Sequence, residues 1–580
     1  MLQASESGSF GWQGLFDPVE IVQTREPGQI ILKLEQVENL VERGLYAAGF
    51  VAYEAAEGID SAFRTRHGRD LPLLWFGLYR KMEPIELPCV MTPETFSLGQ
   101  WTPSISVAEY EAAFDRIKNY IASGDTYQVN FTLRLRSLFE GDPWQLFCRL
   151  CRAQPSPFAA FVDTGRYAIC SASPELFFTL EGRDLVSKPM KGTAPRGLTP
   201  SEDNARKKEL EVSEKNRAEN AMIVDMVRND MGRIADVGSV RVSSLFKVER
   251  LPTVFQMTST VTCTTSASFT EIMKALFPCA SITGAPKVRT MEIIRDVEKD
   301  RRGIYTGCIG YLAPGRRAMF NVAIRTVVID REHKKAQYGS GGGIVWDSVG
   351  AEEYAECQTK AMVLFSDRPE FELLESLLWD GENGYFLLDG HLKRLGESAE
   401  YFNFAVDLDA LKTRLEEFGK QIGLGKHKVR LCVNRTGNIF LESTPIMSRP
   451  ASSPWKLGLA IKPVDWRDPF LYHKTTNRAV YNSAATNCTD CDDILLWNEH
   501  GEVTETKIGN LVIEKDGQLL TPPVKCGLLA GAFRAFLLER GEIAEKIIKV
   551  QDLQQAKKIF MINSVRKWLP AVIVFGPKIA

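Results

Sequence analysis

The sequence lacks several features that would each assign it to a particular class of protein. Hydrophobic residues make up 44% of the 580 residues, but no apolar run approaches the roughly 20 residues that span a bilayer. The opening MLQASESGSFGW has no basic start, apolar core or small-residue cleavage site, so we expect a cytoplasmic protein with no membrane role. The net charge of −2 comes from interleaved signs and offers no basic face, so nucleic acid is not an expected partner.

Two cysteine patterns are also missing. The pairs Cys148/Cys151 and Cys488/Cys491 have no histidine at zinc spacing, so no zinc site is predicted and the thiols are expected to be reduced. The G-x-C-x-G turn that carries the nucleophile of class I glutamine amidotransferases is absent. Its nearest match is TGCIG, in which Thr306 replaces glycine and Cys308 is interpreted as a buried core residue.

The length predicts several structural units, at roughly 150 residues per domain. Helical stretches alternate with short β-rich runs from Trp101 to about Phe365, which indicates one large α/β unit. The first hundred residues carry no separate domain signal and are assigned to it. A new series begins after SDRP, with GENG as a hairpin turn. We therefore predict domains at 1–365 and 366–580, with a subdomain break in the Ser/Pro-rich stretch near 448–454.

Two segments could present carboxylates to one cation. A helix is predicted in SEKNRAENAMIVDMVRNDMGRI, with Ser213 as its N-cap and Glu219 near its start. In GAEEYAECQTKAMVLF, Glu353 and Glu356 share a helix face, and carboxylate oxygens suit a hard cation such as Mg²⁺. On spacing alone, an ion pair between Glu356 and Lys360 at i+4 is the favoured alternative.

Two glycine-containing stretches lie between these helices. GSGGGI and SITGAPK would let backbone N–H groups approach an anionic ligand closely. A glycine run alone more often marks a tight turn. Spacing therefore leaves both interpretations open.

Six motifs in a fixed order carry a family resemblance. They are KPMKGTAPRG, ENAMIVDMVRNDMGRI, FPCASITGAPKVRTMEII, YTGCIGY, NVAIRT and GSGGGIVWDSVGAEEYAEC. Over about residues 100–365 the sequence resembles the chorismate-utilising enzymes, which include anthranilate, aminodeoxychorismate, isochorismate and salicylate synthases. The resemblance implies a layered α/β sandwich like that of anthranilate synthase component I.

Lys191 of KPMKGT distinguishes branches of that family. The aminodeoxychorismate synthases carry lysine at this position, whereas anthranilate synthases typically carry alanine. The resemblance thus implies amination of chorismate at C4 without loss of pyruvate, with Lys191 as a transient nucleophile. It also implies chorismate as substrate and ammonia delivered by a separate glutamine amidotransferase subunit.

The resemblance implies roles for further residues of the first domain. Glu219 and Glu356 would hold Mg²⁺, with Glu353 in contact through water. The ring-carboxylate side would be lined by Ser281 and Gly284. The enolpyruvyl carboxylate would be bound by Tyr305, Arg325, Gly339, Gly341, Gly342 and Gly343, because an arginine fork suits a carboxylate; the alternative for Arg325 is a surface ion pair. Asn216 and Gln256 depart from the residues that relatives often carry at their positions.

The last third of the chain, from about Phe371 to Val574, resembles fold-type IV pyridoxal phosphate enzymes. The class includes branched-chain and D-amino-acid aminotransferases and aminodeoxychorismate lyase, and implies a class IV aminotransferase-like α/β fold of two subdomains. Lys474 in YHKTTNR would bond to the cofactor aldehyde and Glu505 would pair with the pyridine nitrogen. Arg394 and the backbone around GLLAGAFR, including Gly531 and Ala532, would bind the phosphate. A homodimer through this domain is one arrangement the class allows.

Together the two resemblances predict consecutive steps on one chain, from chorismate to 4-aminobenzoate by amination and then elimination of pyruvate. The cofactor residues alone do not distinguish a lyase from an aminotransferase. One alternative is an anthranilate synthase component I fused to an amino-acid aminotransferase, which Lys191 disfavours. Another is a non-catalytic scaffold, which would require decayed sites.

Overall fold

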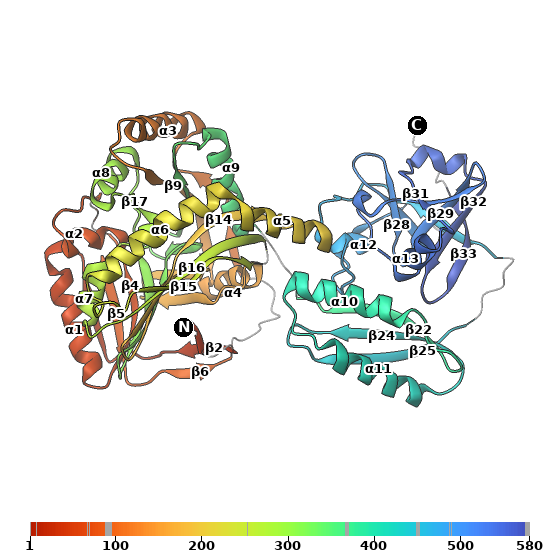
Figure 1. Cartoon of the computed structure of the whole chain (residues 1–580), viewed down its shortest axis with the longest axis horizontal. Coiled ribbons are helices and arrows are strands. Elements are labelled where there is room, and N and C mark those ends of the chain that lie inside the picture. Colours follow the sequence, from red (N-terminus) through yellow and green to blue (C-terminus); the bar gives the residue numbers. More distant parts are fainter. Residues whose placement is uncertain are drawn as a thin grey trace. The chain divides into compact units, whose positions relative to one another are not determined.

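The computed structural model describes residues 2–6, 9–66, 68, 70–86, 95–251, 253–365, 370–447, 453–486, 488 and 490–574. The chain divides into two compact units (Figure 1). The first comprises Met1–Pro195 and Lys207–Arg368, and the second comprises Arg196–Arg206 and Pro369–Ala580. SDRP and most of the predicted break at 448–454 lie outside the described residues. No helix in the described ranges is long and apolar enough to cross a membrane.

The first unit contains two large antiparallel sheets. One has the order β17-β9-β21-β20-β11-β10-β1-β2-β6, with β7 and β8 also paired to β9. Its strands are β1 (Leu2–Glu6), β2 (Ser9–Gly14), β6 (Glu83–Ile85), β7 (Phe96–Leu98), β8 (Thr102–Pro103), β9 (Gln128–Gly141), β10 (Phe158–Asp163), β11 (Tyr167–Ser173), β17 (Gly284–Ala285), β20 (Thr326–Asp330) and β21 (Lys335–Ile344).

The second sheet of this unit has the order β14-β16-β13-β12-β19-β18-β4-β5-β3, with β15 paired to β16. Its strands are β3 (Glu20–Thr24), β4 (Tyr46–Val51), β5 (Leu74–Tyr79), β12 (Leu176–Glu181), β13 (Asp184–Lys188), β14 (Met190–Pro195), β15 (Arg241–Arg250), β16 (Val254–Thr264), β18 (Cys308–Ala313) and β19 (Arg317–Val322).

Strand β4 shows why the sheets are stacked in layers. Side chains alternate between the two faces of a strand, and both faces of β4 are apolar. Ala47 and Val51 join a core on one side, whereas Ala48 and Phe50 join a core that also contains Ile169 of the other sheet. The two sheets therefore face each other across a shared apolar layer.

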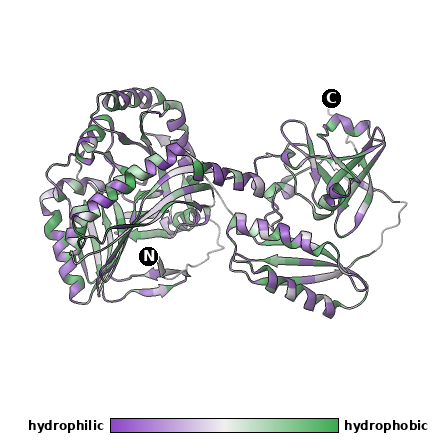
Figure 2. Cartoon of the chain, viewed as in Figure 1, coloured by the Kyte–Doolittle hydropathy of each residue, from purple (hydrophilic) through white to green (hydrophobic). Residues whose placement is uncertain are grey.

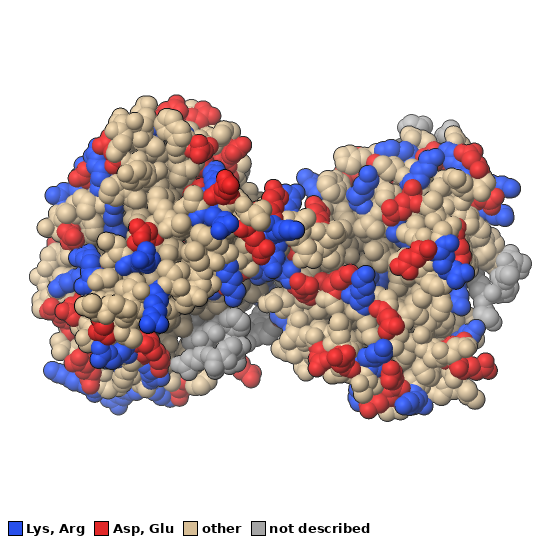
Figure 3. Space-filling view, in the orientation of Figure 1, with Lys and Arg blue, Asp and Glu red and all other residues tan. Residues whose placement is uncertain are grey.

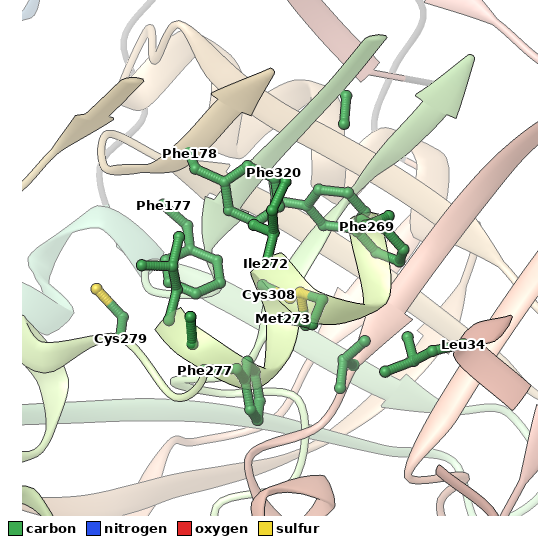
Figure 4. Packing of buried hydrophobic residues seen from close by; sticks show 14 of the residues in the cluster. Leu34, Phe177, Phe178, Phe269, Ile272, Met273, Phe277, Cys279, Cys308 and Phe320 are labelled. Carbon is green, nitrogen blue, oxygen red and sulfur yellow. The ribbon is translucent and has the colours of Figure 1, made fainter. Parts of the chain in front are cut away.

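Helices cover the outer faces. The four buried residues of α1, from Ile30 to Val41, recur at helical spacing and pack with α6 and α7 on one sheet. The core around α7 includes Phe269, Phe178 and Phe320, whose rings stack in pairs 5.3–5.4 Å apart (Figure 4). The other sheet is covered by α3, α4 and α8. The helices are α1 (Ile30–Glu42), α2 (Ala56–Ile59), α3 (Val107–Ala122), α4 (Pro143–Ala153), α5 (Pro200–Val212), α6 (Glu214–Gly232), α7 (Phe269–Leu276), α8 (Lys287–Val297) and α9 (Gly350–Ala361).

The second unit contains a four-stranded and an eight-stranded sheet, of orders β23-β22-β24-β25 and β28-β27-β26-β33-β32-β29-β30-β31. GENG forms the predicted turn between β22 and β23. The elements are β22 (Leu373–Asp380), β23 (Gly384–Tyr385), α10 (Leu388–Phe402), α11 (Leu408–Ile422), β24 (Lys426–Val433), β25 (Ile439–Pro445), β26 (Trp455–Leu459), α12 (Ala479–Ser483), β27 (Asp493–Trp497), β28 (Val503–Thr506), β29 (Asn510–Lys515), β30 (Gln518–Thr521), α13 (Ala532–Glu539), β31 (Ala544–Glu545), β32 (Lys558–Asn563) and β33 (Lys567–Val574).

Each of these sheets has its own core. Val429, Leu431 and Val433 of β24 alternate inward to meet α10 and α11, leaving Lys428 and Arg430 on the opposite side. Helix α11 is accordingly amphipathic, with green and purple residues alternating along it in Figure 2. In the larger sheet β28 also pairs with β29, which closes six strands into a ring. The cluster around the four-stranded sheet is thus separate from those around the larger sheet.

The segment Arg196–Arg206 groups with the second unit, although the sequence division placed it in the first. Arg196 and Asp203 form an ion pair whose side chains are 5% and 2% exposed. Arg196 also donates to the Tyr401 carbonyl and lies 4.2 Å from the Tyr401 ring. The buried ion pair and its contacts with Tyr401 attach the segment to the second unit. The residue patterns of the sequence did not indicate this attachment.

One expectation about cysteines is wrong. Cys488 and Cys491 form a disulfide in the second unit, with Cα atoms 5.9 Å apart. This Cα separation lies within the range that a disulfide bridges. The predicted buried state of Cys308 is confirmed.

Candidate active sites

A cavity of about 350 Å³ in the first unit collects most of the predicted residues. Its walls come from β14, α6, α9, β21 and the connections before β17 and β20, elements that are far apart in sequence. The predicted residues that line it are Lys191, Glu219, Ser281, Tyr305, Arg325, Gly339, Gly341, Gly343, Glu353 and Glu356. Gly284 and Gly342 are not part of the lining.

Gly284 and Gly342 have packing reasons to lack a side chain. Gly284 has φ +146°, a conformation that favours glycine, and a Cβ there would run into the backbone oxygen of Gln128. At Gly342 a Cβ would come within 2.9 Å of a Glu353 oxygen. Gly284 thus allows β17 to approach β9, and Gly342 allows α9 to approach β21.

The glycine run is a strand rather than a tight turn. Residues 339–344 of β21 pair with β9, but β20 pairs only with residues 335–338. One edge of the glycine segment therefore has no strand partner among the described residues, and the Gly341 carbonyl accepts a hydrogen bond of 2.8 Å from the Lys360 amine. Added side chains at Gly339 and Gly343 would collide with the Tyr305 ring and with the Lys191 amine. The glycines keep space open in front of both groups.

The predicted carboxylates line this cavity but already have neighbours. Ser213 caps α6 as predicted, and Glu219 lies in its second turn. Glu353 accepts a hydrogen bond of 2.6 Å from Ser348, and burial raises the pKa of Glu353. Glu356 forms the alternative i+4 ion pair with Lys360 at 2.7 Å. Partial desolvation opposes ionisation of Glu356, but the charge and hydrogen bond of Lys360, together with the charges of Lys191 and Lys215, outweigh it and lower the pKa of Glu356.

These carboxylates do not form a ready-made metal cluster. Among the described residues, a cluster with ligand atoms all within 4.8 Å of one another is found elsewhere, near the β20–β21 turn. It consists of Asp330, Glu332 and His333. A magnesium ion at the predicted position would instead rely on one or two protein carboxylates together with substrate and water, which is its common mode of binding.

Arg325 is not in a surface ion pair. Its guanidinium donates at 2.7 Å to the Lys360 carbonyl, in the last turn of α9, and its backbone has φ +52°. The Arg325 side chain also lines the cavity beside Tyr338. Of the two departures from the family pattern, Gln256 is held by β14, since it accepts from Thr193 at 3.0 Å and donates to the Gly192 carbonyl at 2.8 Å.

Glu175 is a cavity residue that sequence reasoning missed. It is 3% exposed, and its Oε1 accepts a hydrogen bond of 2.6 Å from Ser281. Burial raises the pKa of Glu175 to about 7, against the opposing effects of Ser281 and of the Lys191 charge. A carboxyl group inside an apolar strand run, as in SASPELFFTL, was the available signal.

A second cavity, of about 360 Å³, lies within the second unit. The predicted residues that line it are Arg394, Lys474, Glu505 and Gly531. Ala532 does not line it, but it is the first residue of α13, and Gly531 is the N-cap without a side-chain cap. The free N–H groups of the first helical turn are suited to an anion.

Glu505 is held by three donors. Tyr481 donates to its Oε1 at 2.7 Å, the Leu529 amide to the same oxygen at 3.1 Å and the Asn510 amide to Oε2 at 3.1 Å. Burial raises the pKa of Glu505 to about 7 even so. Tyr481 and Asn510 were not predicted, and they fix the orientation of this carboxylate.

Lys474 and Arg394 differ in their pairing. Burial lowers the pKa of Lys474 to about 8, and the Arg394 charge adds to the effect. Arg394 forms a two-point ion pair with Glu375 at 2.8 and 2.6 Å and donates to the Ala530 carbonyl at 3.0 Å. Burial disfavours the Glu375 carboxylate, but the Arg394 and His391 charges outweigh it and lower its pKa. Arg394 therefore anchors the loop that leads into α13.

Comparison with known proteins assigns a family to this arrangement. Residues 16–366, more than half of the chain, match the family of chorismate binding enzymes, and residues 372–574 match the class IV amino-transferases. The chain belongs to the chorismate binding enzyme family. Its first unit has the corresponding layered sandwich, and its second unit follows as a class IV aminotransferase-like domain.

Individual relatives match the first part. Aminodeoxychorismate synthase component 1 of Klebsiella aerogenes is 44% identical over 265 residues, which cover 45% of this chain and 58% of that protein. Anthranilate synthase component 1 3 of Haloarcula marismortui is 42% identical over 260 residues, 44% of this chain and 51% of that protein. The chain thus spans somewhat more than half the length of these relatives.

A solved structure has the same fold in this region. Anthranilate synthase component I from Streptococcus pneumoniae superimposes with a TM-score of 0.54 at 24% identity, covering 62% of this chain and 93% of that one. Sequence identity is similar for relatives that are named for two different activities. The residues of the cavity therefore have to distinguish between these activities.

Proposed function

We propose that the chain converts chorismate and ammonia into 4-amino-4-deoxychorismate at the first cavity and then releases pyruvate from it at the second, giving 4-aminobenzoate. The observation that carries the proposal is Lys191. Its amine lies against Gly343 in a cavity that also contains Glu175, Arg325 and the α6 and α9 carboxylates. An amine beside groups suited to a dicarboxylate can act as a nucleophile toward the ring.

The carboxylates of the first cavity have the right chemistry for Mg²⁺. They offer hard oxygen ligands from two helices, and the cavity leaves room for substrate and water. Glu219 and Glu356 would hold the ion, with Glu353 in contact through water. When bound, the ion would draw electron density out of the ring through the ring carboxylate.

The chain's own groups account for the proton and for substrate orientation. Loss of the C4 hydroxyl requires a proton, and Glu175, with a pKa of about 7, is protonated in about half of the molecules at neutral pH and can donate it. Ser281, hydrogen-bonded to Glu175, keeps that carboxyl group in place. Arg325, Tyr305 and the backbone of Gly339, Gly341 and Gly343 would bind the enolpyruvyl carboxylate. The neutral Lys191 amine would attack the ring as the C4 hydroxyl takes the Glu175 proton and leaves as water, and ammonia would then add at C4 as the bond to Lys191 breaks and frees the amine.

The second cavity fits pyridoxal phosphate. A buried amine, a buried carboxylate and the uncapped start of α13 meet the needs of its aldehyde, ring nitrogen and phosphate. The cofactor supplies an electron sink for the carbon that loses its proton. Lys474, with its lowered pKa, can move that proton. Glu505 would hold a protonated ring nitrogen, and Tyr481 and Asn510 keep it oriented.

The nitrogen donor is proposed to be ammonia from a separate glutamine amidotransferase subunit. The sequence has no glutaminase nucleophile turn, and Cys308 is buried in the core. The purified chain should therefore use ammonium salts but not glutamine, and up to about pH 7 it should do so more efficiently as pH rises, because the fraction of free NH₃ increases. Efficient use of glutamine by the chain alone would exclude this partner.

The proposal is tested by separating the half-reactions. Without pyridoxal phosphate, the chain with chorismate, an ammonium salt and Mg²⁺ should accumulate an aminated product that retains the enolpyruvyl group, as detected by mass. Adding the cofactor should then release pyruvate from it. Release of pyruvate before the cofactor is added would indicate anthranilate-type chemistry instead.

A further inference from the structure

Positive charge is in large excess along the second cavity. Eight lysine and arginine side chains line it, against the single acidic residue Glu505. A phosphate group brings about two negative charges, and a cavity with unmatched positive charge attracts further anions. The excess is therefore larger than cofactor binding requires.

Four of the eight already have partners or roles. Lys474 is the proposed cofactor lysine. Arg394 and Arg534 form ion pairs with Glu375 and Glu545. The guanidinium of Arg478 lies 4.0 Å from the Tyr481 ring. The remaining four, here called the basic rim, are Lys428, Arg430, Lys507 and Arg566.

No ion pair joins the basic rim to a carboxylate in the part of the chain that the structure describes. Lys428 and Arg430 lie two apart on β24 and so share one face of the strand, and both are exposed. Glu442 of β25 is opposite Arg430 but does not approach within ion-pair distance; a hydrogen bond with Cys432 and the more distant charges of Glu442 and Glu372 raise the pKa of Arg430. Arg566, in the turn between β32 and β33, donates to the Met447 carbonyl at 3.2 Å.

We propose that the basic rim binds the two carboxylates of a dianionic substrate and sets the specificity of this cavity. Identification of that substrate as aminodeoxychorismate rests on the proposed function. An amino acid with an apolar side chain has one carboxylate and would leave most of the rim unpaired. A ligand with two separated carboxylates can engage β24 and the β32–β33 turn together, by charge-assisted hydrogen bonds.

Binding of unreactive ring acids tests this inference. The full chain loaded with pyridoxal phosphate is titrated with benzene-1,3-dicarboxylate and with benzoate by calorimetry. The wild-type chain should bind the dicarboxylate at least about tenfold more tightly, as expected for an added interaction with charged groups. The double variant Lys428→Gln with Arg430→Gln should lose that preference. Equal binding of both acids by wild type would overturn the proposal.

Lys426→Gln is the matched control. Lys426 lies on the same face of β24, its substitution removes a charge, and it does not line the cavity. It should keep the preference, whereas loss of preference in this variant would mean that net charge alone is responsible. Retention of the cofactor's visible absorbance in the double variant shows that the domain remains folded.

Kinetics separate this inference from the proposed function. With supplied aminodeoxychorismate, the double variant should raise KM about tenfold or more and change kcat little. If the wild-type chain releases no pyruvate yet prefers the dicarboxylate, the lyase assignment fails and the basic rim stands. If wild type releases pyruvate and the double variant keeps the wild-type KM, the lyase stands and the basic rim fails.

Discussion

The two cavities place a lysine near carboxylates in different ways. In the second, Glu505 is 3% exposed and held by three donors, so the polar groups are oriented before any ligand arrives. In the first, Glu356 pairs with Lys360 and has 46% of its side-chain surface exposed. An exposed carboxylate such as Glu356 can change partners when a cation and a substrate bind. A carboxylate that is already held in one orientation, such as Glu505, suits a cofactor that stays bound. The comparison teaches that the first site is completed by its ligands and the second is preorganised.

Both units nevertheless present charge in a similar way at the surface. On the face shown in Figure 3, lysine and arginine are interspersed with aspartate and glutamate over both units. The contrast between the two cavities is therefore not matched by a contrast in charge on this face of the units.

Lys474→Ala should have the largest effect, because one group both attaches the cofactor and moves the proton. We expect pyruvate release from aminodeoxychorismate to fall by at least about 10³-fold and the visible absorbance of the attached cofactor to disappear. Consumption of chorismate at the first site should continue. Exposed Lys462 lies outside the cavity, and Lys462→Ala should behave as wild type. Normal pyruvate release by the Lys474 variant would remove the lyase assignment.

Lys191→Ala should impair the first half-reaction by at least about 10²-fold, since a nucleophile is lost. Initial rates of chorismate consumption measure the effect, and product mass shows whether chemistry is diverted toward anthranilate. Lys188→Ala, which removes a lysine of β13 paired with Glu249, is the control. An unchanged synthase rate in the Lys191 variant would argue against nucleophilic catalysis.

Removing the cation should slow the reaction at the first site and leave the reaction at the second site unchanged. Chelation of Mg²⁺, or Glu356→Ala, should slow the first half-reaction by about 10²-fold and leave pyruvate release from supplied aminodeoxychorismate unchanged. Both half-reactions are assayed on the same preparation. Equal losses in both would contradict two independent sites.

The smallest effect expected is a pH dependence from Glu175. Its acid form is the proton donor and its pKa is about 7, so activity should fall as pH rises through 7. At a fixed concentration of free NH₃, kcat/KM for chorismate should decrease about tenfold per unit above that pH. Glu175→Gln should be slow and lack this limb. A wild-type profile that is flat between pH 6 and 9 would assign the proton to another group.

Most of the fold was predictable because ordered motifs identify it, and most of the residues assigned to the first site line one cavity. The Ser213 cap and the GENG turn depend on local chemistry and were predictable. Glu175 and Tyr481 were missed, since their importance arises from burial beside residues distant in sequence. The same is true of the Arg196–Asp203 pair, which groups residues 196–206 with the second unit.

Glycine and cap positions show the limit in detail. Gly339 and Gly343 do line the cavity, whereas Gly284 and Gly342 serve close packing, and a motif cannot distinguish these uses. Likewise Ala532 is the first residue of α13 but does not line the second cavity. Only the position of each residue in the folded chain distinguishes those that line a cavity from those that serve packing.

The central claim is most directly tested by identifying the final product. The complete chain is incubated with chorismate, an ammonium salt, Mg²⁺ and pyridoxal phosphate, and the aminobenzoate isomer and pyruvate are quantified together. The account predicts 4-aminobenzoate and pyruvate in equal amounts, with pyruvate dependent on the cofactor. Formation of 2-aminobenzoate, with pyruvate released in the absence of pyridoxal phosphate, would contradict it.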